Sequence, residues 1–273
     1  MAAVLPRAPN SRESREALLA KHTRQIILAF VTWRMRLIPA KPRTVKFWSG
    51  GVPPLEARAA AAALEPFLKK VEAGEDLTPH LSNLVNTKGI ILPGARPGDR
   101  GKDVDLVLAR EGLHHFHIGV ASPTNRTGRS DQLVFAHVLK DEFRIIALAG
   151  HGVFEKHSPE ALRFLEISRS YMARDIPPGQ GFMANPVMSS GHSMLVTGFA
   201  LKCEDQIRLT DPLLDDPAFV GKLYDNGAPI VIDGKVVPKP ASPKIKWHFE
   251  DLQFGVLDKD TNVFFCFFPF FER

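Results

Sequence analysis

The chain reads Leu-His-His-Phe-His-Ile-Gly-Val over residues 113–120, Gln-Leu-Val-Phe-Ala-His-Val-Leu over residues 132–139 and Phe-Arg-Ile-Ile-Ala-Leu-Ala over residues 143–149. Each run is apolar and has the length of a strand, and the polar residues 140–142 make a turn of hairpin length. Ser158 is a suitable N-cap for a helix over about residues 158–172, and Pro159 suits its first turn. The region predicts an antiparallel β-meander followed by a helix.

The flanking regions contain further elements. Apolar spacing predicts helices over residues 15–37 and 54–72, a short strand at 45–48 and a helix near 193–202, and residues 1–12 are predicted to be a disordered leader. Two β-hairpins are expected over residues 230–237 and 252–268. The predicted fold class is α+β: a central antiparallel β-meander with N-terminal helices and a β-rich C-terminal extension. The predicted parts are a basic arm and helix (1–46), a central α+β domain (47–176) and an extension packed on the same core (177–273).

Composition indicates a soluble globular protein. Of 273 residues, 44% are hydrophobic and 24% are charged. No apolar segment is long enough to span a bilayer, and the N-terminus lacks the pattern of a secretory signal, so we expect a cytoplasmic protein without membrane contact. The two cysteines lack metal-like spacing and fit a reducing compartment. The chain has no P-loop and no dinucleotide fingerprint, which disfavours nucleotide hydrolysis and hydride transfer.

Positive charge is concentrated near the N-terminus. The net charge is +5, and residues 1–46 hold ten Lys or Arg against two acids. Such an arm suits contact with a phosphate backbone, although a solvated helix face with a disordered tail has the same composition. The expected nucleic-acid-binding residues are Arg34, Arg36, Lys41, Arg43 and Lys46, together with Arg126 in the loop after the first meander run.

Three of the ten histidines lie in the first run of the meander. On a strand, His115 and His117 share one face, while His114 lies on the other with Phe116 and is expected to be a core histidine. Two imidazoles on one strand face are also found in metal sites, with a third ligand to come from elsewhere. Candidate third ligands are His137, His151 and His157, but the motif His-Glu-x-x-His is absent.

RNA cleavage without a metal is the other chemistry that these residues suit. It needs a base for the 2′-hydroxyl, an acid for the 5′-oxygen and a cation for the phosphate. The predicted catalytic set has a base (His115 or His117), an acid (His151) and two phosphate-binding arginines (Arg129 and Arg144), and no cofactor. Alternatively, Arg144 pairs with Asp141 or Glu142 near a sheet edge.

The three runs, the segment Gly-His-Gly-Val-Phe-Glu-Lys at 150–156 and the helix after it resemble the central meander of RelE/HigB-type toxins. The resemblance covers about residues 112–172, and these toxins lack the large N- and C-terminal parts of this chain. It implies a ribosome-associated, mRNA-cleaving fold of a toxin–antitoxin system. The chain as a whole, including Asp-Pro-Leu-Leu-Asp-Asp-Pro at 211–217, resembles an uncharacterised bacterial protein family, which implies no function.

The leading hypothesis is a metal-independent endoribonuclease of toxin or defence type that cleaves RNA by 2′-hydroxyl attack. Its expected partners are RNA or the ribosome and an antitoxin or inhibitor protein. One alternative is a non-catalytic module that binds nucleic acid or protein, and another is a histidine-ligated metal-dependent enzyme. Catalysis requires His117 and His151 to converge in one pocket with an arginine, whereas a binding module does not.

Overall fold

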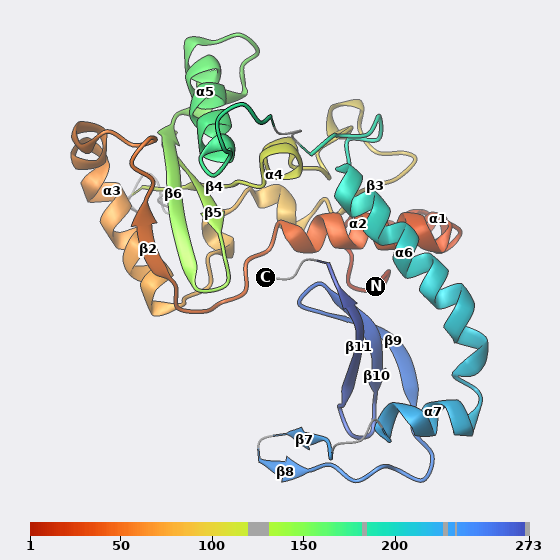
Figure 1. Cartoon of the computed structure of the whole chain (residues 1–273). Coiled ribbons are helices and arrows are strands. Elements are labelled where there is room, and N and C mark those ends of the chain that lie inside the picture. Colours follow the sequence, from red (N-terminus) through yellow and green to blue (C-terminus); the bar gives the residue numbers. More distant parts are fainter. Residues whose placement is uncertain (120–130, 182–184, 226–228, 233, 271–273) are drawn as a thin grey trace.

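The computed structural model describes residues 1–119, 131–181, 185–225, 229–232 and 234–270 (Figure 1). The helices are α1 (Arg12–Leu19), α2 (Thr23–Met35), α3 (Pro54–Ala73), α4 (Leu106–Glu111), α5 (Pro159–Ala173), α6 (Met194–Thr210) and α7 (Pro217–Tyr224). Short 3₁₀ turns are η1 (Thr78–His80), η2 (Asn83–Asn86), η3 (Pro97–Asp99), η4 (His151–Phe154) and η5 (Asp211–Leu213). No helix in these ranges is both long and apolar enough to cross a membrane.

Within the described residues, the strands form four sheets. They are β1 (Arg7–Ala8), β2 (Thr44–Phe47), β3 (Ile90–Ile91), β4 (His114–His117), β5 (Leu133–Val138), β6 (Glu142–Ala149), β7 (Val231–Ile232), β8 (Lys235–Val236), β9 (Ile245–Glu250), β10 (Gln253–Asp258) and β11 (Phe264–Pro269). The α+β class, the central antiparallel meander and the β-rich C-terminal region are confirmed.

The central sheet has the strand order β2-β6-β5-β4. β4, β5 and β6 form the antiparallel meander, and β2 adds to β6 in parallel, so the complete sheet is mixed. The β5–β6 register shifts between Phe135 and Ala136, and a bulge of this kind bends the strands locally. β4 and β2 are the edge strands.

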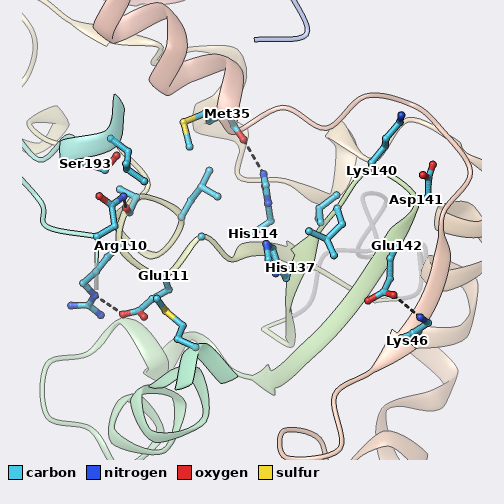
Figure 2. A pocket seen from close by; sticks show the side chains of 18 of the residues that line it. Met35, Lys46, Arg110, Glu111, His114, His137, Lys140, Asp141, Glu142 and Ser193 are labelled. Atoms are coloured by element: carbon cyan, nitrogen blue, oxygen red, sulfur yellow. Dashed lines mark hydrogen bonds and ion pairs between the residues drawn. The ribbon is translucent and has the colours of Figure 1, made fainter. Parts of the chain in front are cut away.

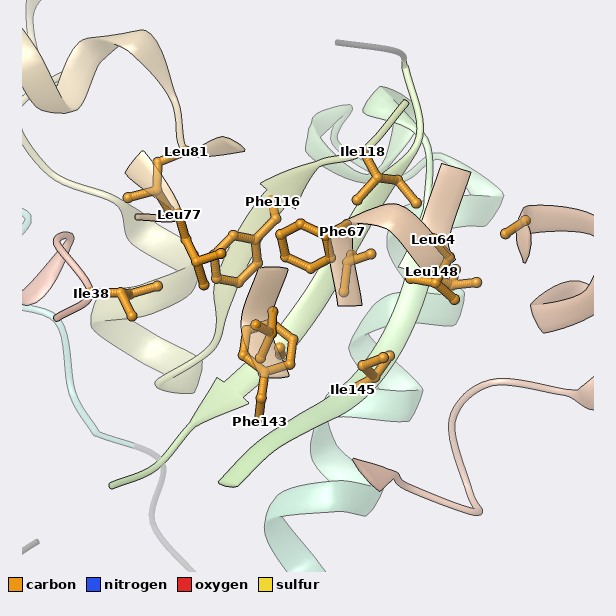
Figure 3. Packing of buried hydrophobic residues seen from close by; sticks show 14 of the residues in the cluster. Ile38, Leu64, Phe67, Leu77, Leu81, Phe116, Ile118, Phe143, Ile145 and Leu148 are labelled. Carbon is orange, nitrogen blue, oxygen red and sulfur yellow. The ribbon is translucent and has the colours of Figure 1, made fainter. Parts of the chain in front are cut away.

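Helices cover both faces of this sheet. Alternate strand residues such as Phe116, Phe143 and Ile145 pack against Leu64 and Phe67 of α3 (Figure 3). The intervening residues, which include Phe135 and Ile146, pack against the side of α5 that carries Phe164 and Tyr171. Ser158 caps α5 by accepting the N–H of Ala161, as the sequence predicts. Burial of both period-two faces against helices favours one strand register, because a one-residue slip would move each set of side chains to the opposite face, where it would pack against the wrong helix.

A second core lies between the N-terminal and C-terminal parts of the chain. Ile27 and Phe30 of α2 pack against Phe199 and Cys203 of α6, and Phe254 of the sheet β11-β10-β9 completes the cluster. Figure 1 shows α2 and α6 side by side above this sheet. The aromatic end of the chain is therefore largely core material: three of its phenylalanines, Phe267, Phe268 and Phe270, pack against this cluster.

Two predictions for the N-terminus are wrong. The helix predicted over residues 15–37 is two helices, α1 and α2, because α1 packs beside the N-terminal segment while α2 packs on α6. The predicted disordered leader is ordered: Leu5 is 1% exposed, and β1 pairs in parallel with β3. Leu5 joins Leu18 and Ile90 in one apolar cluster. The Pro-rich composition of residues 1–12 could not predict this pairing, because β3 lies more than eighty residues further along the chain.

Candidate active site

Three histidines meet at one end of the central sheet. The ring centroids of His117 and His151 are 5.2 Å apart, and those of His115 and His117 are 6.2 Å apart. The ring of Phe154 lies beside them, 5.4 Å from His115 and 6.1 Å from His151 between centroids. Side chains from β4 and η4 thus form one imidazole cluster, which we call the histidine cluster (His115, His117 and His151).

The strand register explains why these residues meet. His117 is opposite Leu133 at the start of β5, and Leu133 is opposite Ala149 at the end of β6. η4 begins at His151, directly after β6, so this histidine lies at the same end of the sheet as His117. Strand alternation places His115 on the same face as His117. Local sequence order and antiparallel pairing are therefore enough to assemble the cluster.

A carboxylate lies against His115. Asp105 is the N-cap of α4, and its Oδ1 accepts the N–H groups of Val107 and Leu108, both at 3.1 Å. Its Oδ2 lies 3.2 Å from Nδ1 of His115, a contact that makes an ion pair when His115 is protonated rather than an aligned hydrogen bond. Burial acts to raise the pKa of Asp105, but His115 and the N–H of Leu108 outweigh burial, so this pKa is lowered. Asp105 is therefore a carboxylate that holds one side of the cluster.

The other side of the cluster faces water. The side chain of His151 is 47% exposed, whereas that of His115 is 13% exposed. Nδ1 of His151 lies 3.5 Å from Oδ1 of Asp131, whose own side chain is fully exposed. His151 is therefore accessible from solvent, while His115 is enclosed.

The backbone around His151 is fixed by the start of α5. The carboxylate of Glu160 accepts the N–H of Gly150, and Ser158 Oγ donates to the carbonyl oxygen of Gly152 at 2.6 Å. A Cβ at Gly152 would lie 2.5 Å from Oε2 of Glu160, so only glycine fits there without a shift. The two residues that flank His151 are thus both anchored to one helix N-terminus.

A backbone carbonyl on the outer edge of β4 also accepts a side-chain hydrogen bond. Nδ1 of His80 donates to the carbonyl oxygen of His117 at 3.0 Å, and Nζ of Lys70 lies 3.3 Å from Nε2 of His80. Since Lys70 is a donor only, Nε2 of His80 is the acceptor and Nδ1 carries the proton. The edge carbonyl beside the cluster therefore has a side-chain donor.

Of the two predicted phosphate-binding arginines, Arg144 is the one that the structure describes, and it does not lie beside the histidine cluster. Arg144 is opposite His137, near the other end of β5, and its Nε donates to Glu142 at 2.5 Å. This is the pairing that the sequence offered as the alternative role of Arg144. Arg126 and Arg129 lie outside the described residues.

Two residues of the basic arm have structural roles. Arg36 is buried and donates to the carbonyl oxygens of Lys88 and Asp103. Arg43 is also buried and donates to the carbonyl oxygen of Leu139. Buried guanidinium groups that satisfy backbone carbonyls are not available to a phosphate. The prediction that Arg36 and Arg43 bind nucleic acid is therefore corrected.

The other three arm residues lie closer to the surface. Each has a carboxylate within 4.0 Å: Arg34 has Asp251, Lys41 has Asp141 and Lys46 has Glu142. These ion pairs reduce the positive charge that the sequence suggested for the arm.

The histidine cluster does not supply a recognisable metal site. Within the part of the chain that the structure describes, no group of three or more His, Cys, Asp or Glu side chains is arranged to hold a metal ion. His137, one proposed third ligand, lies away from the cluster, with Nδ1 2.7 Å from the hydroxyl of Tyr171. His157 lies in the turn before α5 and is exposed.

Sequence reasoning missed Asp105, Asp131, Phe154 and Glu160 as neighbours of the cluster. Asp105 did carry a signal, because an Asp before a short apolar run is a typical N-cap. Comparison of the chain with protein-family models, with curated proteins and with solved structures finds no match in any of the three. The candidate site must therefore be interpreted from its own geometry.

Proposed function

We propose that this protein is a metal-independent endoribonuclease of toxin or defence type. The observation that carries the proposal is the 5.2 Å separation of the His117 and His151 rings, which come from different elements and lie at an open end of the sheet. Two imidazoles at this distance can contact both the attacking 2′-oxygen and the departing 5′-oxygen of one phosphate. The resemblance of the meander to RelE/HigB-type toxins supports the same chemistry.

The proposed reaction is transfer of the phosphoryl group within RNA. His117 removes the proton of the 2′-hydroxyl, the 2′-oxygen bonds to phosphorus, and the bond from phosphorus to the 5′-oxygen breaks. His151, in its protonated form, gives its proton to the departing 5′-oxygen. The products are a 2′,3′-cyclic phosphate and a 5′-hydroxyl, so atoms and charge balance without a metal or redox partner.

The remaining neighbours have supporting roles in this proposal. His115, which contacts Asp105, lies beside His117 on the enclosed side of the cluster. Charge on the phosphate oxygens requires a cation, and Arg129 remains a predicted donor, with Arg126 beside it in the sequence as a predicted contact to RNA. Arg34, Lys41 and Lys46 remain the predicted, salt-sensitive contacts to the rest of the RNA.

The test is RNA cleavage in the presence of EDTA. The purified wild type is incubated with ribosomes and with naked RNA, and His117→Ala and His151→Ala are assayed in parallel. We expect wild-type cleavage to persist in EDTA and each variant to lose about 10²–10⁴-fold in rate, which is the usual contribution of a general acid or base. His22→Ala is the control, because His22 is exposed and pairs with Glu204 on α6.

Three outcomes contradict the proposal. An inactive wild type on both substrates would favour a binding module, in which the histidines do not act on RNA. Cleavage that EDTA abolishes would favour the metal-dependent alternative. Cleavage that survives in both histidine variants would place the activity elsewhere or in a contaminant.

A further inference from the structure

A large cavity lies at the end of the meander opposite the histidine cluster. Its volume is about 860 Å³, which is within the usual range for small-molecule sites. The end of α2, α4, the β5–β6 turn, β2, the end of α5 and the segment before α6 contribute to its wall. It is therefore built by segments that are distant from one another in the chain.

Most of the wall is apolar. The larger apolar residues that line it are Met35, Leu108, Val138, Leu139, Met172 and Leu195. Leu139 and Leu195 keep 37% and 51% of their surface exposed although they lie beside this hollow. Exposed leucines that border a concave apolar wall mark a surface that a ligand can cover.

The charged groups of the wall lie on two sides, and His114 and His137 lie between them. Figure 2 shows Arg110 and Glu111 on one side, and Lys140 with Lys46 and Glu142 on the other. Arg110 and Glu111 form an ion pair at 2.6 Å, so that side is close to neutral.

The side formed by β2 and the β5–β6 turn carries an excess of positive charge. Its two acids are neutralised: Asp141 pairs with Lys41 at 2.6 Å, and Glu142 pairs with both Lys46 and Arg144. The hydrogen bond from Lys41 lowers the pKa of Asp141, and that from Lys46 lowers the pKa of Glu142, so both stay ionised. Lys140 is exposed, lies in the cavity wall and forms no ion pair with any described residue.

We propose that this cavity binds a small amphipathic carboxylate, with its apolar body against the leucine and methionine wall and its carboxylate at Lys140. A neutral apolar molecule would leave Lys140 without a counter-ion, and a cation would meet a surface of its own sign. The site is separate from the histidine cluster, so this inference does not depend on the proposed nuclease activity.

The test is calorimetric titration of the full chain with decanoate, kept below the concentration at which it forms micelles. Decanol is the neutral comparison. We expect saturable one-site binding of decanoate and at least about fivefold weaker binding of decanol, as expected for the loss of one exposed ion pair.

A charge-reversal variant in the cavity wall tests whether decanoate binds at this cavity. Lys140→Glu is expected to weaken decanoate binding by about fivefold or more, since it replaces an attraction with a repulsion. Lys69→Glu makes the same charge change on the exposed surface of α3, outside the cavity, and should leave binding unchanged. Both side chains are exposed, so neither variant is expected to unfold.

A third variant tests the apolar wall. Leu139→Asn replaces the apolar end of an exposed side chain of the turn with an amide of similar size, and is expected to weaken decanoate and decanol alike, because both lose the same apolar contact. The proposal is overturned if decanoate does not bind, if decanol binds equally well, or if the Lys140 and Lys69 variants behave alike. Equal binding of decanoate by the Leu139 variant and the wild type would also overturn it.

Discussion

The two carboxylate oxygens of Asp105 contact different neighbours. One oxygen closes the first turn of α4 through two backbone N–H groups, and the other faces His115. The residue that begins α4 is therefore also the one that contacts His115, and the loss of Asp105 would remove both the helix cap and this contact. The cap and the ion pair can be separated, because Asn caps a helix about as well as Asp but carries no charge.

We predict different consequences for Asp105→Ala and Asp105→Asn. Asp105→Ala loses the cap and the charge, and the cap alone is worth about 1 kcal/mol of unfolding free energy. Asp105→Asn keeps the cap and loses only the contribution of the charge. Urea unfolding at pH 7 should therefore rank stability as wild type, then Asn, then Ala. Equal stability of the two variants would contradict a capping role.

The same carboxylate predicts a pH effect. The folded-state pKa of Asp105 is below its ordinary value of 3.8, so its stabilising contribution is present above that value and is lost as the pH falls through the folded-state pKa. Asp105→Asn cannot titrate, so we expect it to lose less stability than the wild type between neutral and acid pH. Urea unfolding of both proteins at several pH values measures this difference. A steeper acid loss in the variant would contradict the assignment.

At the scale of elements, η4 depends on α5. Glu160 and Ser158, in the first turn and at the N-cap of α5, hold Gly150 and Gly152 on either side of His151. The orientation of His151 is therefore set by a helix end rather than by η4 itself, which is a single short 3₁₀ turn.

We predict that Gly152→Ala displaces the Glu160 carboxylate and frees the N–H of Gly150. Faster hydrogen exchange of the Gly150 amide, with little change in overall stability, is the expected result, because the new Cβ would meet Oε2 of Glu160. Gly181→Ala is the control, since a Cβ there meets nothing within 4 Å. In a Glu160→Ala background the Gly152 substitution should have no further effect, and an additive effect would contradict the coupling.

The sequence predicted the elements that depend on local pattern. The three apolar runs became β4, β5 and β6, and strand alternation correctly separated His115 and His117 from Phe116. α4 was missed because it has only six residues and follows a Gly-rich and Pro-rich segment. Without α4, Asp105 could not be placed beside His115. The buried positions of Arg36 and Arg43 were missed for a related reason, since their carbonyl partners come from remote loops.

At the scale of the whole molecule, the N-terminal segment pairs and packs with distant parts of the chain. β1 pairs with β3, and Leu5 packs in a cluster that also contains residues of α1 and α2. A segment that the composition described as a leader is thus part of the folded body. It covers the same α2 whose opposite side packs on α6.

We predict that Leu5→Ala destabilises the whole protein by about 2–5 kcal/mol, the usual cost of removing a fully buried leucine side chain. Val4→Ala is the matched control, because Val4 is the preceding residue and is 62% exposed. Its effect should remain within about 0.5 kcal/mol. Thermal unfolding of both variants measures the difference, and a Leu5 variant as stable as the Val4 variant would show that the segment is not part of the core.

The imidazole that His80 places against the outer side of β4 has a consequence for behaviour in concentrated solution. An edge strand can recruit a strand from another molecule, and such recruitment leads to aggregation. β4 is only four residues long, and the carbonyl oxygen at its last residue already accepts a side-chain proton. His80 therefore removes one docking point for a foreign strand at the end of β4 that carries the histidine cluster.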